Sequence, residues 1–208
     1  MQCAAGTVHY VPGRVVGPQS SVSVKDIAEA WYRRPQLLPP DVDTGVFSYA
    51  SHAVAVAVDV EVGSIEILDY VIAEDCGRMV NPMVVDGQTM GGAAQGIGTA
   101  LFEESPYDAN GQPLASTFMD YLLPGPTEVP KFRIHHTETL SPHTAFGIKG
   151  MGEGGAIAPP AALFNAVNDA LRGIDVELSE TPLTPRRLLS AVEQAAARQR
   201  SIDAGTSA

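Results

Sequence analysis

The sequence contains few of the residues that bind metals tightly. Only Cys3 and Cys76 occur among its 208 residues. Two thiols are too few for a disulfide framework or a cysteine-rich zinc site, and they exclude an iron–sulfur cluster held by this chain alone. His135 and His136 are adjacent on a predicted strand, so their side chains face opposite ways and do not easily bind one ion. We therefore predict no metal site built from this chain's own side chains.

Positive charge and long apolar runs are also scarce. There are 13 lysines and arginines against 24 aspartates and glutamates, and the net charge is −11. This balance excludes the usual nucleic-acid-binding proteins, which neutralise phosphates with clustered cations. No apolar run of about 18 residues is present to span a membrane. The first 20 residues lack the basic and continuous apolar regions of a signal peptide, so we expect a cytoplasmic chain.

What the sequence does contain is enough apolar residue for a sizeable core. Apolar residues make up 45% of the chain and charged residues 18%, a composition typical of a globular protein. An antiparallel hairpin is predicted over residues 53–73. Valines alternate in its first half, Gly63-Ser64 forms the turn, and a second apolar run follows. Asn81-Pro82 predicts the start of a helix that continues through Glu103 or Glu104.

The remaining elements complete a prediction of an α+β fold, with a mixed sheet and helices packed on one side. We expect two subdomains that meet near Gly125, within an ordered region of residues 1–200. Helices are predicted over residues 24–34, over 159–172 with an end at Gly173, and from Pro185 onward; strands over 131–138 and 174–178; and a disordered tail over 201–208.

The densest chemical signal is the segment of residues 147–155, hereafter the Glu153 loop. Five of its nine residues are glycine, and Glu153 is its only carboxylate. Successive glycines let backbone N–H groups approach and bind an anion. A carboxylate held beside an electrophilic centre is placed to act as a general base. The alternative is a glycine-rich turn in which Glu153 is merely solvated.

The same loop contains a dinucleotide-binding pattern, which gives a second alternative. Gly150, Gly152 and Gly155 have the G-x-G-x-x-G spacing, and Asp175 lies about where the ribose-binding acid of a nicotinamide enzyme is expected. That fingerprint should follow a buried strand. Residues 141–146 have the composition of a loop instead, and Glu153 would place a negative charge near the pyrophosphate. Both observations disfavour the dinucleotide-binding interpretation.

A second signal is a predicted helix interrupted by glycines. Each glycine destabilises a helix by up to about 1 kcal/mol relative to alanine, so propensity does not explain them. Gln88 and Gln95 are seven residues apart and share a face, where their amides suit recognition of a pterin edge or an oxo group. The alternative is close helix packing with surface glutamines. The glycines concerned are Gly87, Gly91, Gly92, Gly96 and Gly98.

Three segments in order make the chain resemble the molybdenum hydroxylases, the family of xanthine dehydrogenase, aldehyde oxidase and carbon monoxide dehydrogenase. They are residues 73–104 (AEDCGRMVNPMVVDGQTMGGAAQGIGTALFEE), 120–130 (DYLLPGPTEVP) and 146–171 (FGIKGMGEGGAIAPPAALFNAVNDAL). The resemblance extends over about Val22 to Leu189 and implies a molybdopterin-binding domain. The family's large subunit is several times longer, so this chain looks like its C-terminal portion.

The resemblance implies a role for each signal. Glu153 matches the family's catalytic glutamate, the base in a hydroxylation that takes its oxygen from water. Gln95 looks like the glutamine beside the pterin and the molybdenum. The other implied cofactor-binding residues are Gln88, Gly91 and Gly92, which help hold the pterin or its dinucleotide tail, and Lys149, Gly150, Met151 and Gly152, which form the loop across the metal's face.

The resemblance also implies the cofactor and the partners. The cofactor is molybdopterin cytosine dinucleotide with molybdenum, shared with a chain that supplies the rest of the molybdenum subunit. Iron–sulfur clusters and FAD belong to two further partner subunits. Aldehydes, purines or other N-heterocycles, and carbon monoxide are all compatible substrates. The alternative function is a non-catalytic assembly or cofactor-handling module that retains the fold.

Overall fold

The computed structural model describes residues 5–33 and 46–206, and the chain divides into two compact units between Gly45 and Val46. The first unit contains the short antiparallel strands β1 (His9–Val11), β2 (Arg14–Val16) and β3 (Ser21–Ser23), followed by α1 (Val24–Arg33). Ser23 Oγ accepts a hydrogen bond from the Asp26 amide at 3.0 Å. This N-cap explains why α1 begins where it was predicted to begin.

The second unit is built on a three-stranded sheet in the order β4 (Tyr49–Asp59), β5 (Ser64–Asp75), β6 (Phe132–His136). β4 and β5 form the predicted hairpin, and β6 pairs with β5 in parallel, so the sheet is mixed as expected. Exposed and covered residues alternate along β4. That alternation means that one face of the sheet is covered while the other is open.

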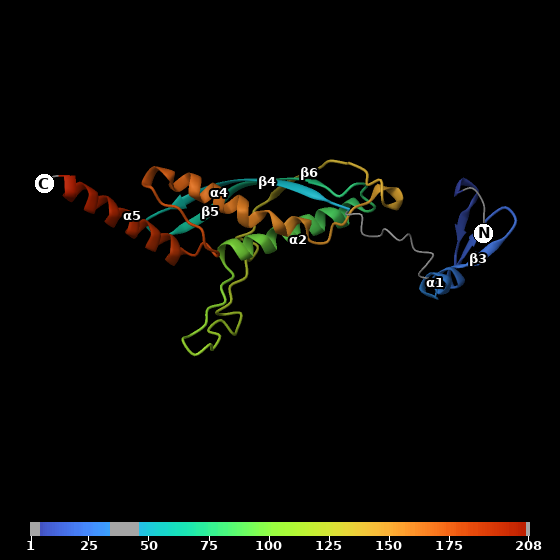
Figure 1. The fold of residues 1–208 in the computed structure, drawn as a ribbon, viewed down its shortest axis with the longest axis horizontal. Coiled ribbons are helices and arrows are strands. Elements are labelled where there is room, and N and C mark those ends of the chain that lie inside the picture. Colours follow the sequence, from blue (N-terminus) through green and yellow to red (C-terminus); the bar gives the residue numbers. More distant parts are fainter. Residues whose placement is uncertain (1–4, 34–45, 207–208) are drawn as a thin grey trace. The chain divides into compact units, whose positions relative to one another are not determined.

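Helices cover the inner face of this sheet. They are α2 (Pro82–Leu101), the single turn α3 (Gly154–Ile157) and α4 (Pro159–Leu171); α5 (Pro185–Thr206) adds Leu188 to the same core. In Figure 1, α2 and α4 run alongside β4 and β5, and α4 contacts both β4 and α2. The core lies between these layers and includes the fully buried Tyr70, Ile72, Ile97, Leu163 and Leu188. The predicted α+β architecture is confirmed.

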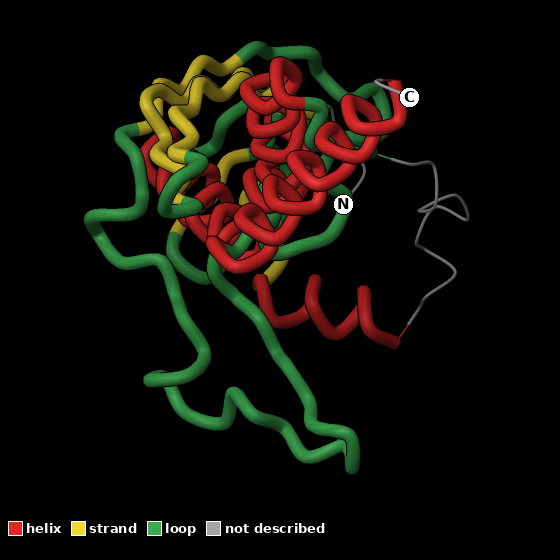
Figure 2. The backbone as a smooth tube through the Cα atoms, turned by 90° about the vertical axis from the view of Figure 1, so that its left-hand side faces the viewer, coloured by secondary structure: helices red, strands yellow, loops and turns green. Residues whose placement is uncertain are grey.

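The start of α2 follows its sequence signal closely. The Asn81 side chain accepts a hydrogen bond from the Val84 amide at 3.3 Å, and Pro82 occupies the first helical position. The helix ends at Leu101, slightly before the predicted Glu103 or Glu104. A long connection follows it, seen as the extended green loop in Figure 2, and leads to β6. Gly125, near which we expected two subdomains to meet, lies in this connection, inside the second unit.

The predicted strand over residues 174–178 is wrong. The chain leaves α4 through a 3-10 turn, η4 (Arg172–Ile174), and Asp175 then adopts the left-handed conformation with φ 55°. Helix α4 itself ends at Leu171, one residue before the predicted end, and the left-handed residue of the turn is Asp175 and not Gly173. The Asn168 side chain hydrogen-bonds both backbone groups of Leu178. It accepts from the N–H at 2.8 Å and donates to the carbonyl at 2.9 Å. These groups are therefore not available to a strand ladder.

The predicted disordered tail is helical as far as the structure describes it. Helix α5 continues past Ser201 to Thr206. The Ser201 hydroxyl donates to the Ala197 carbonyl at 3.1 Å, one turn earlier. Along the first half of α5, Leu188 is fully buried and Ala195 is nearly so. Within the described ranges, no helix is both long and apolar enough to cross a bilayer.

Candidate functional site

The two glycine-rich segments that the sequence singles out lie against each other. The Gln88 side chain donates a hydrogen bond from Nε2 to the Gly152 carbonyl at 2.8 Å. A Cβ atom at Gly155 would lie 2.3 Å from the Thr89 carbonyl oxygen, and one at Gly92 would lie 2.9 Å from the Ala156 nitrogen. α2 and α3 therefore meet backbone to backbone, a contact that only glycine permits.

This contact explains some glycines of α2 and leaves others open. Gly92 and Gly96 face α3 and the start of α4, so close helix packing accounts for them. At Gly87 and Gly91, by contrast, an added Cβ would meet nothing within 4 Å. Of the two glycines implied to hold the pterin, Gly91 is accessible and Gly92 is engaged in packing.

Replacing Gly155 with Ala is expected to lower the free energy of unfolding by about 2 kcal/mol, since the added methyl group must push backbone aside. Gly150→Ala is the matched control: an added Cβ there meets nothing within 4 Å. Its effect should stay within about 0.5 kcal/mol. Urea unfolding followed by circular dichroism measures both variants. Equal stability of the two variants would contradict the close contact of α2 and α3.

A buried ion pair anchors the Glu153 loop to the sheet. Lys149 Nζ lies 2.9 Å from Asp75 Oδ1 and 2.6 Å from Thr139 Oγ1. The Lys149 side chain is 8% exposed and that of Asp75 is not exposed at all. The Lys149 amide also donates to the Cys76 carbonyl at 2.8 Å. The resemblance places Lys149 in the loop across the metal's face. Its ammonium group points into the protein toward Asp75, so the part of Lys149 that is left to face a cofactor is its backbone.

Asp75 is the electrostatic centre of this anchor. Burial alone would raise its pKa, but hydrogen bonds outweigh burial and hold the pKa of this carboxyl well below its usual range. The donors are the Lys149 ammonium, the Gly77 amide, Thr139 and the Tyr49 hydroxyl. Asp75 is therefore a carboxylate at neutral pH that ties the end of β5 to the loop.

Sequence reasoning missed Asp75. The available signal was a pair of acids, Glu74-Asp75, at the end of a strongly apolar strand. Charged residues are seldom fully buried unless they are paired. Cys76, next in the chain, is buried as a small structural residue, and burial raises the pKa of its thiol.

Glu153 lies on the outer side of the loop. It is the N-cap residue of α3, it is exposed, and its carboxylate has no hydrogen-bond partner in the part of the chain that the structure describes. Gly150 and Gly152, just before it, are exposed, and an added Cβ at either would meet nothing within 4 Å. The carboxylate and the loop backbone are thus accessible together.

Gln95 is similarly available, on the face of α2 that it shares with Gln88. Its side chain is exposed, and its amide has no partner among residues 5–33 and 46–206. Seven residues of helix place it about 10 Å along the axis from Gln88, which is bonded to the loop. A polar cofactor rich in oxygen and nitrogen, such as a pterin, suits this surface. The Gln95 amide both donates and accepts hydrogen bonds, and the backbone is open on the helix at Gly91 and on the loop at Gly150 and Gly152.

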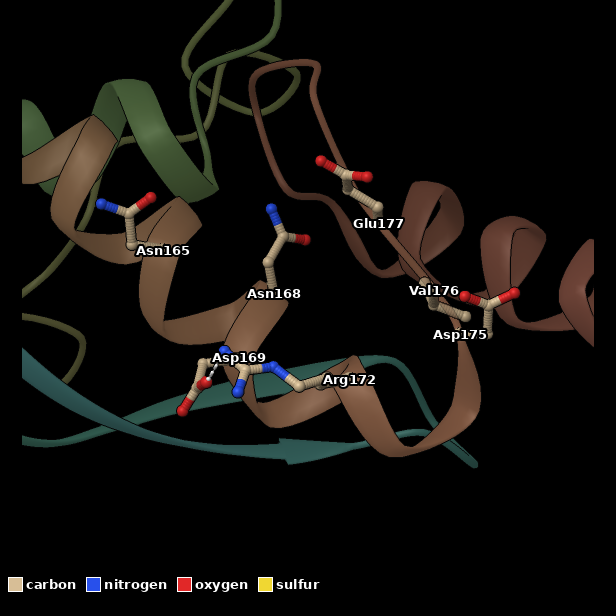
Figure 3. Close-up of a pocket in the computed structure, with 7 residues that line it drawn as sticks. All are labelled: Asn165, Asn168, Asp169, Arg172, Asp175, Val176 and Glu177. Carbon is tan, nitrogen blue, oxygen red and sulfur yellow. Dashed lines mark ion pairs between the residues drawn. The ribbon is translucent and has the colours of Figure 1, made fainter.

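The dinucleotide-binding alternative does not fit this geometry. Asp175 lines a cavity of about 670 Å³ with Asn168, Asp169 and Arg172, shown in Figure 3. Asp169 and Arg172 pair across 2.6 Å. Asp175 follows the C-terminal end of α4, whereas the Glu153 loop precedes its N-terminal end. The 13 residues of α4 separate the two by about 20 Å, so Asp175 does not accompany the glycine pattern.

The histidines of β6 are placed as predicted on opposite faces. His135 is exposed, and His136 turns inward, where its Nε2 lies 2.7 Å from Asp86 Oδ1. Within the described residues, no group of three or more histidine, cysteine, aspartate or glutamate side chains is arranged to hold a metal ion.

Comparison with known proteins places these features in a family. A family model described as "Molybdopterin cofactor-binding domain" matches residues 1–130. The chain is 40% identical over 187 residues to the nicotine 6-hydroxylase large subunit of Paenarthrobacter nicotinovorans, covering 84% of the chain and 23% of that protein. It is 31% identical over 194 residues to the carbon monoxide dehydrogenase large chain of Afipia carboxidovorans, covering 87% and 24%. The chain thus spans about a quarter of the length of these relatives.

Solved structures agree with the sequence relatives. Quinoline 2-oxidoreductase from Pseudomonas putida 86 superposes with a TM-score of 0.72 at 36% identity, covering 91% of this chain and 26% of that one. Reconstituted CO dehydrogenase from Oligotropha carboxidovorans superposes with a TM-score of 0.70 at 28% identity, covering 93% and 26%.

Proposed function

Because the chain belongs to the molybdopterin cofactor-binding domain family of the molybdenum hydroxylases, we propose that it supplies the catalytic glutamate and part of the cofactor site of such an enzyme. The observation that carries this proposal is the contact between the Glu153 loop and α2, made by Gln88 and Gly152. It brings the two segments that resemble the family's site into one surface with Glu153 on its outer side.

The cofactor would be held by a small set of groups. Gln95 offers its amide, Gly91 its open helix face, and residues 150–152 their backbone N–H groups. When bound, the molybdenum cofactor supplies a redox centre that accepts electrons from the substrate and delivers oxygen derived from water. Gln88 bonds the loop to α2, and Lys149 ties it to the end of β5 through Asp75. Their role is to position the loop.

Glu153 acts as the general base in this proposal. Its exposed carboxylate would accept the proton that the attacking, water-derived oxygen loses as it bonds to an electron-poor carbon of the substrate. The hydrogen that this carbon loses would leave with its bonding electron pair, which the bound cofactor would take up. The α3 turn and the Lys149–Asp75 pair flank Glu153 on either side in the chain and fix its backbone. A fixed base saves the entropy of orienting a mobile group at each turnover.

An N-heterocycle is the substrate class that we propose. Relatives whose names refer to nicotine and quinoline are 40% and 36% identical to the chain, whereas carbon monoxide dehydrogenases are 28–31% identical. We propose further that a partner chain completes the molybdenum subunit, that iron–sulfur and FAD subunits carry the electrons away, and that the assembly is cytoplasmic. The two cysteines of this chain cannot ligate such clusters alone.

Composition of the native complex tests this proposal. The complex would be purified from its own cells through a tag on this chain, then analysed for metals and for acid-released nucleotides. We expect molybdenum close to one atom per copy of this chain, cytidine nucleotide in equal amount, and iron and flavin on the co-purifying chains. An intact assembly without molybdenum would contradict the proposal and favour the alternative, a non-catalytic assembly or cofactor-handling module.

A further inference from the structure

A cavity of about 300 Å³ lies behind the Glu153 loop. Residues 48–50 in and before β4, Glu74 near the end of β5, and Gly154, Ile157 and Ala158 around α3 line it. Gly154 directly follows Glu153 in the chain. Whatever fills this cavity, hereafter the Glu74 cavity, therefore contacts the segment that carries the proposed base.

Glu74 gives the cavity its chemistry. It is only 1% exposed. Its Oε2 accepts a hydrogen bond from Thr89 Oγ1 at 2.7 Å. Its Oε1 is buried and has no hydrogen-bond partner among the residues that the structure describes. A buried carboxylate oxygen without a donor is unfavourable and rare in folded proteins, so it marks the place of a missing donor.

The neighbouring carboxylate shows what Glu74 lacks. Asp75 receives the Lys149 ammonium at 2.9 Å together with several neutral donors. In residues 5–33 and 46–206, no ion pair of 4.0 Å or less involves Glu74. Of these two adjacent buried carboxylates, Asp75 is thus paired with a cation, whereas Glu74 has none within the described residues. The unmet requirement at Glu74 is for a positively charged donor.

We propose that the Glu74 cavity receives an arginine side chain from the chain that completes the molybdenum subunit. Ala50, Ile157 and Ala158 offer apolar walls for the alkyl stem, and Glu74 Oε1 offers the acceptor for the guanidinium group. A guanidinium is more weakly hydrated than an ammonium group, so it enters a largely apolar cavity more readily. Calcium would need about six oxygen ligands, and the cavity has a single side-chain carboxylate.

The rim of the cavity indicates a protein as the source of this arginine. Ile157 is 79% exposed, and Phe47, directly before the first lining residue, is also 79% exposed. Large apolar side chains around a pocket that holds a charge acceptor are typical of a protein interface with an arginine anchor. The identity of the donor chain rests on the proposed function, whereas the preference of the cavity for a guanidinium group does not.

Binding at this cavity is coupled to the Glu153 loop. A Cβ atom at Gly154 would lie 2.5 Å from Glu74 Oε1, so the carboxylate packs directly beneath the first residue of α3. A guanidinium that fixes Glu74 therefore also fixes Gly154 and, through the chain, Glu153. Glu74 is in this sense a positioning residue.

Titration of the 208-residue chain with ethylguanidinium chloride, followed by NMR of backbone amides, tests the inference without any cofactor. We expect saturable shifts at Ala50, Gly154 and Ala158. Glu74→Gln, which keeps the shape but removes the charge, should weaken binding by about tenfold or more, because a charge-assisted bond is lost. N-Ethylurea, an uncharged analogue, and ethylammonium should both bind more weakly than ethylguanidinium.

Two further variants keep the test decisive. Glu66→Gln, on the exposed face of the same strand, should bind ethylguanidinium like the unaltered chain. If Glu74→Gln does not fold, as judged by circular dichroism, Glu74→Asp retains the charge but withdraws it by one methylene and should bind more weakly. Unsaturable shifts, equal binding by the Glu74 variant, or tighter binding of ethylammonium would overturn the inference. Molybdenum in the native complex would be unaffected by that result, so the two proposals fail separately.

Discussion

Replacing Asp75 with Asn is expected to destabilise the second unit by about 3–5 kcal/mol, the usual cost of removing one partner of a buried ion pair. The variant leaves the Lys149 ammonium 8% exposed and without its counter-charge. It also weakens the bonds that Thr139 and the Gly77 amide donate to the carboxylate. Urea unfolding at neutral pH, followed by circular dichroism, measures the loss.

The same residue should dominate the acid sensitivity of this region. Hydrogen bonds depress the pKa of Asp75 in the folded chain, whereas the unfolded value is about 3.9. Its stabilising contribution is therefore present in full above the unfolded pKa and is lost as the pH falls through the folded pKa. We expect the unaltered chain to lose stability steeply below about pH 4, and the Asp75→Asn variant to lose less over the same interval. Parallel pH profiles would contradict this role.

A surface ion pair provides the matched control. Asp169 and Arg172 lie 2.6 Å apart, but their side chains are 68% and 82% exposed. Asp169→Asn should change the free energy of unfolding by less than about 1 kcal/mol, because water screens exposed pairs. A double variant, Asp75→Asn with Lys149→Met, should recover part of the loss, since it removes the uncompensated charge.

Local patterns were sufficient to predict the elements whose signals are themselves local. The alternating valines of β4 and the Asn81-Pro82 start of α2 determine those elements through period and capping. The segment 174–178 has the composition of a strand, but the Asn168 side chain, in the preceding helix, takes its hydrogen bonds. A competing side chain ten residues away is not visible in a local pattern.

The candidate site was predictable to a similar extent. Glycine density identified both the Glu153 loop and α2, because close backbone contact requires glycine wherever it occurs. It did not distinguish glycines that pack, such as Gly92, from those that stay open, such as Gly91. The Lys149–Asp75 pair joins residues 74 positions apart, so nothing in the sequence near either residue indicates it. The resemblance places Lys149 in the loop at the cofactor, and the structure adds that its side chain bonds that loop to Asp75.

The proposed chemistry depends most on Glu153. In the Glu153→Gln complex, the amide has nearly the shape of the carboxylate but cannot accept the proton. General bases contribute about 100-fold to 10,000-fold to rate, so turnover of an N-heterocycle such as quinoline should fall by at least about 100-fold. The Glu153 side chain makes no bond within the described part of the chain, so the complex should assemble and retain its molybdenum.

Glu138→Gln is the control for this change. Glu138 is also an exposed glutamate, two residues after the end of β6, and its weak pairing with Arg78 at 3.8 Å is at the surface. Its replacement should leave turnover unchanged. The decisive measurement is turnover per bound molybdenum in the Glu153→Gln complex beside the Glu138→Gln complex. We predict a fall of at least about 100-fold in the first and none in the second; near-normal turnover per molybdenum in the Glu153→Gln complex would contradict the assignment of Glu153 as the base.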